Sequence, residues 1–274
     1  MKIFFSILLV FFILCVGLKA QFKSTVKQQN TSQLNVTSSY YKNIDIRNTK
    51  TLFNQLSSLI VLTHTKKLRY SPDTWQALKK TDSDLNNSDN IILIYGSNNS
   101  DKEITNDYSR DKNSGGVGRG KWNREHVYPK SLGNPNLGIE GPGADIHMLR
   151  PSDVKQNSKR GNLPFENASG EARKIKRSWY PGDKWRGDVA RIIMYMYLRY
   201  NARTIPSKVA VSTYKYNKNM PDLFLNWNYI DPVDDFEKKR NEEVFKIQRN
   251  RNPFIDNPYL AYLIWGGPVL KNKW

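Results

Sequence analysis

Residues 122–128 read WNREHVY and place Glu125 directly before His126 inside an apolar, aromatic segment. Histidine is rare in this chain, with three in 274 residues. The aromatic and β-branched residues around the pair favour an extended strand. Successive side chains of a strand point to opposite faces, so both groups reach one phosphate only where the strand ends or bends. A chance pairing on a half-buried strand is the alternative for this dipeptide alone.

The segment 144–165, ADIHMLRPSDVKQNSKRGNLPF, follows within a short distance. We expect a helix that starts at Pro151, is capped nearby by Ser152 and ends at Gly161. Asn157 would then lie on a short helix after the histidine-bearing strand. A strand, a loop and a helix in this order can hold one metal ion between a carboxylate and an amide oxygen.

The remaining pattern predicts an α+β fold, mostly helical, in a single domain. Helical spacing of apolar residues begins at Thr49, and the β-branched run 91–95 suits a strand. The polar, glycine-rich segment 97–121 is expected to be a long mobile loop. Residues 187–201 have the pattern of an amphipathic core helix, and residues 231–249 that of a charged helix beginning at its Asp-Pro pair.

The first twenty residues have the layout of a secretory signal, with Lys2, an apolar core and Ala20 at a plausible cleavage point. We therefore expect a signal peptide over 1–20, a flexible leader over 21–48 and one domain over 49–274. An uncleaved membrane anchor is the alternative for the first segment. Cleavage would give a secreted or periplasmic protein without stable membrane association.

The cysteine count and the net charge limit the kinds of metal site and partner that are expected. Cys15 is the single cysteine and falls within the predicted signal, so disulfides and thiolate metal sites are not expected in the processed chain. Lys and Arg total 43 against 25 Asp and Glu, a net charge of +18. A polyanionic partner such as nucleic acid is the natural expectation, and basicity that serves solubility alone is the alternative.

The other two histidines, His64 and His147, are weaker candidates for a catalytic role. His64 has no acidic neighbour in sequence and is expected to be structural or on the surface. His147 could orient His126 or an active-site loop, or could be a core histidine bonded to the backbone. The basic cluster 173–177 is assigned to electrostatic attraction of a phosphate backbone.

The ordered motifs resemble the endonuclease I family of secreted or periplasmic nucleases, members of the ββα-metal (His-Me finger) group. WNREHVYPKS and DIHMLRPSDVKQNSKRGN carry the resemblance, which extends over residues 49–265 through YSPDTWQALKKTDSD, WYPGDKWRGDVARIIMYMYLRY and LNWNYIDPVDDFEKKRNEEVFKIQRNRNPFIDNP. It implies a ββα-metal active-site motif within the single domain, and a monomer.

The resemblance also implies roles for individual residues. It aligns His126 with the general base, and Glu125 and Asn157 with the ligands of one divalent metal. With less support than these three, it suggests Arg150, Arg160 and Arg251 as phosphate contacts, the first two as catalytic residues. Solvent-facing arginines on a short helix are the alternative for Arg150 and Arg160. Some relatives are disulfide-linked, and the lack of cysteines here puts in doubt only properties that depend on such links.

The expected function is metal-dependent hydrolysis of phosphodiester bonds in DNA, RNA or both. Mg²⁺ suits an oxygen ligand set that leaves positions open for phosphate, and Ca²⁺ or Mn²⁺ are alternatives. The sequence contains no signature of a module that reads base edges, so contacts to phosphate and low sequence specificity are expected. The alternative function is a non-catalytic basic protein that binds extracellular nucleic acid or surface polyanions.

Overall fold

The computed structural model describes residues 39–274, and within them Asp45–Lys273 form one compact unit. The predicted signal segment 1–20 and most of the predicted leader lie outside the described residues. The helices are α2 (Thr49–Thr63), α3 (Asp73–Thr81), α4 (Val154–Arg160), α5 (Arg186–Tyr200), α6 (Asp222–Ile230), α7 (Asp235–Gln248), α8 (Pro253–Asp256) and α9 (Tyr259–Trp265). The strands are β1 (Asn90–Ile92), β2 (Ser109–Asp111), β3 (Trp122–His126), β4 (Leu149–Asp153), β5 (Arg173–Ile175) and β6 (Ser178–Tyr180). Outside this unit, the rings of Tyr41 and Trp274 lie 4.5 Å apart.

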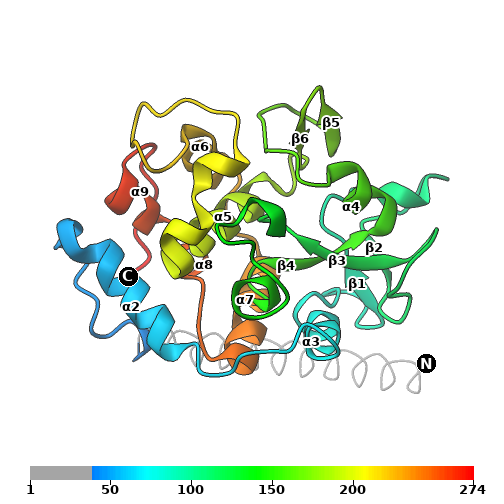
Figure 1. The fold of residues 1–274 in the computed structure, drawn as a ribbon, viewed down its shortest axis with the longest axis horizontal. Helices are drawn as coiled ribbons and strands as arrows, with labels where there is room; N and C mark the ends of the chain where they lie inside the picture. Colours follow the sequence, from blue (N-terminus) through cyan, green and yellow to red (C-terminus); the bar gives the residue numbers. More distant parts are fainter. Residues whose placement is uncertain (1–38) are drawn as a thin grey trace, which may run out of the picture. The chain divides into compact units, whose positions relative to one another are not determined.

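The fold of this unit is mixed α+β, which confirms the predicted class. Figure 1 shows helices α5, α6, α8 and α9 on one side of the unit and the strands with α4 on the other. The helix predicted from Thr49 is α2, and it buries Leu52, Leu56 and Ile60 at helical spacing. Within residues 39–274, every helix is too short or too polar to cross a bilayer.

Helix α5 packs against α2, α6 and α8, and its polar face is buried as well as its apolar one. Asp188 and Arg191 are 5% and 0% exposed. Arg191 donates from Nε to Glu237 Oε1 of α7 at 2.8 Å. The predicted helix 187–201 is thus confirmed within one residue at each end, and its charged side chains hold neighbouring helices together.

The described strands pair two by two, and β3 with β4 forms the pair that matters for the site. The pair is antiparallel, with Glu125 opposite Arg150 and His126 opposite Leu149. α4 follows β4 without a loop. The predicted helix start at Pro151 was wrong, because pairing with β3 keeps the chain extended through Asp153.

Asp153, and not Ser152, caps α4. Its carboxylate accepts hydrogen bonds from the backbone N–H groups of Lys155 and Gln156. The predicted end was right: Gly161 follows α4 with a φ of 54°, a left-handed conformation that glycine adopts without steric strain.

Two other predicted boundaries were also wrong. The segment 97–121 was expected to be one mobile loop, but it contains a 3₁₀ turn (Ile104–Asn106) and strand β2, which pairs with β1. α7 begins at Asp235, because the Asp234 carboxylate caps it by accepting from the Glu237 N–H at 2.9 Å. The aspartate expected to start that helix, Asp231, instead accepts from the N–H of Gly187 at 2.8 Å.

A buried polar network surrounds Asp145, which is 1% exposed. Its Oδ2 accepts from the hydroxyls of Tyr195 at 2.8 Å and Tyr200 at 2.9 Å, and its Oδ1 accepts from Gln248 at 2.9 Å. Although burial alone would raise it, the neighbouring imidazoles of His64 and His147, together with the hydrogen bond from Gln248, lower the pKa of Asp145 to about 2. The network joins the loop before β4 to helices α5 and α7.

Both remaining histidines belong to this network. His147 lies 3.2 Å from the Asn250 carbonyl through Nε2, and its ring packs 4.3 Å from that of Tyr195. Burial lowers the pKa of His147 to about 3, and it lowers the pKa of His64 as well. His147 is therefore a core histidine bonded to the backbone, one of its two predicted roles, and His64 is structural as predicted.

The pKa of His147 predicts acid sensitivity. The unfolded chain binds a proton at His147 near pH 6.5, whereas the folded chain does so only near pH 3. Stability from this group is complete above pH 6.5 and declines as the pH falls toward 3, by up to about 1.4 kcal/mol per pH unit. We expect His147→Gln to remove about 1 kcal/mol per pH unit from the slope of unfolding free energy between pH 6.5 and 5, measured by urea denaturation.

The control is Lys66→Gln, because Lys66 is exposed on the surface, and its slope should match that of the unchanged chain. A slope that His147→Gln leaves unaltered would contradict the assignment.

Candidate active site

Strand β3 carries two of the predicted site residues, Glu125 and His126, on opposite faces. Asn123 and Glu125 alternate with the other residues of the strand and face α4, which contacts both of them. His126 is the last residue of β3, and its ring stacks with that of Tyr70 at 5.6 Å. Glu125 and His126 are thus adjacent at the end of the strand, where both side chains were expected to be able to reach one phosphate.

Glu125 is a buried carboxylate with two strong partners. Its Oε1 accepts from the Tyr95 hydroxyl at 2.8 Å and from Arg160 Nη1 at 3.0 Å. Burial raises the pKa of Glu125, and the adjacent Arg160 charge opposes that rise. The second oxygen, Oε2, receives no side-chain hydrogen bond from residues 39–274.

His126 is oriented by the backbone of a neighbouring turn. Its Nε2 lies 3.0 Å from the carbonyl oxygen of Gly143, in the 3₁₀ turn Gly141–Ala144. A carbonyl can only accept, so Nε2 carries the proton and Nδ1 keeps a free lone pair. Burial lowers the pKa of His126 to about 3, so the imidazole is neutral at pH 7. The geometry gives a neutral nitrogen base with a fixed tautomer.

Asn157 lies in the middle of α4 and faces β3. Its Nδ2 donates to Asn123 Oδ1 at 2.7 Å, two residues before Glu125 on the same strand face. This bond orients the side-chain amide and leaves its oxygen as an acceptor. The structure therefore brings the amide of Asn157 to the strand face that carries Glu125.

Arg160 is buried and binds both Glu125 and the backbone at the end of β3. It is 0% exposed, and besides Glu125 it donates to the backbone carbonyls of His126 at 2.8 Å and Val127 at 2.7 Å. Its guanidinium lies 4.7 Å from the ring centre of Phe165. With these partners, Arg160 fixes the end of β3 to the end of α4, and its predicted contact with phosphate stays a prediction.

Arg150 lies in a buried ionic cluster. It is 1% exposed and donates to Asp82 at 2.6 Å and Asp188 at 3.0 Å. Arg240 shares Asp82 at 3.0 Å. Arg251 is likewise buried and paired with acidic side chains. The observed partners of these arginines are carboxylates, and their predicted phosphate contacts also stay predictions.

The sequence did not reveal several residues that shape the site. Tyr95 lies thirty positions before Glu125, and the Gly143 carbonyl seventeen after His126, so no local pattern indicated either contact. Asn123 could have been found, because residues two apart on a strand share a face.

A metal at this place would have few protein ligands. Among the described residues, no three His, Cys, Asp or Glu side chains gather around one point. The donors available at the end of β3 are one carboxylate oxygen and one amide oxygen. Both are hard oxygen donors of the kind that Mg²⁺ prefers.

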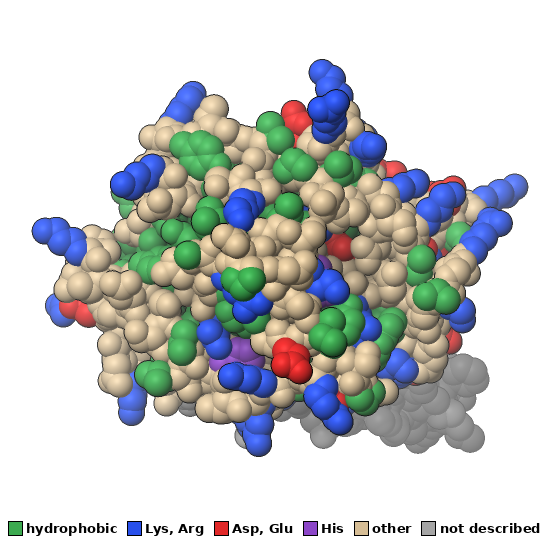
Figure 2. Space-filling model, in the orientation of Figure 1, with side chains coloured by type: hydrophobic (Ala, Val, Ile, Leu, Met, Phe, Trp, Pro, Cys, Tyr) green, Lys and Arg blue, Asp and Glu red, His purple; other side chains and the backbone are tan. Residues whose placement is uncertain are grey.

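Positive charge is widely spread over the surface. Figure 2 shows many separate Lys and Arg side chains on the drawn face and few acidic ones. The predicted basic cluster lies on the β5–β6 hairpin, where Arg173, Lys174, Lys176 and Arg177 are all exposed. These cations are available to a polyanion.

A profile of the Endonuclease I family matches residues 47–259. The chain belongs to the Endonuclease I family, which confirms the resemblance carried by its motifs.

Curated relatives have names that agree with this class. The chain is 42% identical over 241 residues to an extracellular ribonuclease of Bacillus subtilis (strain 168), covering 84% of this chain and 79% of the relative. It is 42% identical to an extracellular ribonuclease of Bacillus amyloliquefaciens, covering 84% and 78%. A periplasmic deoxyribonuclease of Aeromonas hydrophila is 30% identical over 123 residues, 41% of this chain and 47% of that protein.

The buried pair of Arg160 and Glu125 generates a stability prediction. Arg160→Met leaves a buried carboxylate without its cation and should lower the free energy of unfolding by about 3–5 kcal/mol. Urea denaturation at pH 7 measures the loss.

The double variant Glu125→Gln/Arg160→Met tests the same pair without the uncompensated charge. We expect it to be more stable than the sum of the two single losses predicts, because the two residues contact each other. Additive losses would show that the pair is not coupled.

Proposed function

We propose that this protein is a secreted, metal-dependent endonuclease of low sequence specificity that hydrolyses phosphodiester bonds in nucleic acid. Membership of the Endonuclease I family supports the nuclease activity, and the extracellular and periplasmic relatives support export. The observation that carries the mechanism is the hydrogen bond between His126 Nε2 and the Gly143 carbonyl. It leaves Nδ1 of a neutral imidazole free at the end of β3, beside Glu125.

In this proposal, His126 is the general base. Its Nδ1 accepts a proton from the water that attacks phosphorus, and the Gly143 carbonyl holds the imidazolium that results. A neutral imidazole needs no prior deprotonation at pH 7. The negative charge of a bound phosphate raises the pKa of the ring again, so proton acceptance becomes easier in the complex.

Glu125 and Asn157 are the proposed ligands of one divalent ion, for which Mg²⁺ fits best and Ca²⁺ or Mn²⁺ are alternatives. When bound, such an ion neutralises charge on the phosphate and stabilises the leaving oxygen. Glu125 is pre-oriented by Tyr95 and Arg160, and Asn157 by Asn123. Together with the order β3, β4, α4, these contacts support a ββα-metal motif.

The substrate class follows from the relatives and the surface charge. The ribonuclease and deoxyribonuclease relatives support RNA and DNA as candidate substrates. Exposed cations, such as those of the β5–β6 hairpin, suit phosphate contacts that carry no base information. The rival function is a non-catalytic basic protein that binds nucleic acid, and digestion of plasmid DNA and matched RNA with and without EDTA separates the two. Metal-dependent cleavage supports the nuclease, and binding without cleavage supports the rival.

We expect His126→Ala to lower the rate of plasmid nicking by about 10²–10⁴-fold, the usual contribution of a positioned base. Binding of DNA in EDTA should stay within about twofold, because phosphate attraction does not depend on the imidazole.

His147→Gln is the matched control, since it replaces a core histidine and should retain nicking within a few-fold. Nicking by His126→Ala at the rate of the unchanged chain would exclude the imidazole as the base.

Asn157→Ala should weaken metal binding and leave the base intact. We expect the Mg²⁺ concentration for half-maximal cleavage to rise about 10-fold, with partial recovery of rate at high Mg²⁺. Lys159→Ala, at an exposed position two residues further along α4, is the control and should leave this concentration unchanged. A rate defect that no metal concentration relieves would mean that Asn157 acts only in the fold.

A further inference from the structure

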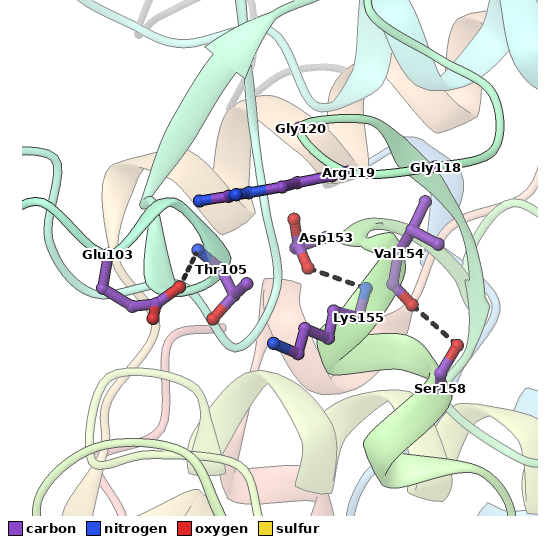
Figure 3. Close-up of a pocket in the computed structure, with 9 residues that line it drawn as sticks. All are labelled: Glu103, Thr105, Gly118, Arg119, Gly120, Asp153, Val154, Lys155 and Ser158. Carbon is purple, nitrogen blue, oxygen red and sulfur yellow. Dashed lines mark hydrogen bonds between the residues drawn. The ribbon is translucent and has the colours of Figure 1, made fainter.

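A pocket of about 550 Å³ lies beside α4, on a different side of the helix from Asn157. Three separate segments form its walls: the 3₁₀ turn Ile104–Asn106 with Glu103 before it, the glycine loop Gly118–Gly120, and the start of α4 with Ser158. Its volume falls within the range of sites that bind small organic ligands. Figure 3 shows the side chains of these segments around the space.

The pocket is held open by one partly buried guanidinium. Arg110 donates to the Lys121 carbonyl at 2.9 Å, to Asp153 Oδ2 at 2.9 Å and to the Ile104 carbonyl at 2.5 Å. The Lys121 carbonyl also accepts from the Val154 N–H at 3.1 Å. Each wall is thus tied to the same cation, so the cavity exists before any ligand arrives.

Two exposed cations reach into this pocket without a salt bridge to any residue in the described part of the chain. Arg119 extends from the glycine loop and Lys155 from the first turn of α4, toward the side of Glu103 and Thr105 (Figure 3). Gly118 and Gly120 flank Arg119 with φ values of 100° and 72°, which L-residues rarely adopt. The backbone N–H groups of Lys155 and Gln156 already bond to Asp153, so the cations and not the helix end supply the attraction.

Two further side chains of the pocket can accept hydrogen bonds, Glu103 before the 3₁₀ turn and Ser158 on α4. One oxygen of Glu103 accepts from the Thr105 N–H at 2.9 Å, and the side chain remains exposed. The Ser158 hydroxyl donates to the Val154 carbonyl at 2.9 Å and can still accept. A carboxylate repels a bare anion placed against it, so Glu103 and Ser158 suit the hydroxyl or amino groups of a sugar or base.

We propose that this pocket is a nucleotide subsite for the substrate strand, in which Arg119 and Lys155 hold a phosphate that flanks the one being cleaved. Glu103 and Ser158 accept hydrogen bonds from the attached sugar or base. The subsite rests on the proposed nuclease function, and it adds binding without joining the chemistry. Ser158 follows Asn157 on α4, so one short helix serves both the site of cleavage and the subsite.

Oligonucleotides of increasing length test this inference with Arg119→Ala/Lys155→Ala. For strands of about ten nucleotides, we expect KM to rise about 10-fold while kcat stays within twofold. For a dinucleotide, which has no flanking phosphate to place in the pocket, KM should stay within twofold. The slope of log KM against log salt on long strands should become shallower by about 0.7 for each phosphate that the variant no longer neutralises.

Two further variants separate a local effect from a general one. Lys50→Ala/Lys66→Ala removes two exposed positive charges that do not line the pocket, and it should leave the dependence of KM on strand length unchanged. Arg119→Lys/Lys155→Arg keeps both charges and should restore most of the affinity.

The outcomes are distinct. If the unchanged chain cleaves and Arg119→Ala/Lys155→Ala raises KM equally at every strand length, or not at all, the subsite is overturned and the nuclease function stands. Absence of cleavage by the unchanged chain with every divalent ion would overturn the nuclease function, and the subsite with it.

Discussion

The burial of Glu125 is the constraint on which the site depends. A carboxylate taken out of water must be matched by donors, and here Arg160 and the Tyr95 hydroxyl supply them. Because Arg160 also binds the carbonyls of His126 and Val127, the end of α4 cannot move relative to the end of β3 without breaking several buried hydrogen bonds. Asn157 lies three residues before Arg160 on the same helix. The hydrogen bonds of Arg160 that compensate the buried charge of Glu125 therefore also position the Asn157 amide beside it.

A second buried ionic cluster fixes the partner strand. Arg150 of β4 is held by Asp82 and Asp188, and Arg240 binds the same Asp82. Buried ion pairs often add little stability compared with apolar packing, but they specify which groups must meet. Such specification matters here because a slip of β4 against β3 by one residue would exchange the faces of the paired side chains. The cluster therefore fixes the register that sets Glu125 opposite Arg150.

Local sequence pattern predicted several of the helices and strands but few of the contacts between them. The apolar spacing after Thr49, the strand around His126 and the end of α4 at Gly161 could all be read from residues close in sequence. The start of α4 could not, because pairing with β3 overrides the helix signal of Pro151. Nor could the partners of Arg150, since Asp82 lies 68 positions away and meets it only in the folded chain. Arginines that resembled phosphate contacts in sequence thus have carboxylate partners in the structure.

This division of the arginines bears on specificity. Those paired with buried carboxylates, among them Arg150, Arg160, Arg191 and Arg240, are already neutralised and contribute little to the field outside the protein. The cations left for a polyanion are on the surface, spread over the face that Figure 2 shows. Long, solvated side chains attract the regular charges of a phosphate backbone whatever the base sequence. The proposed chemistry adds a neutral imidazole and hard oxygen donors, which address the diester alone, so both parts of the molecule support the proposed low sequence specificity.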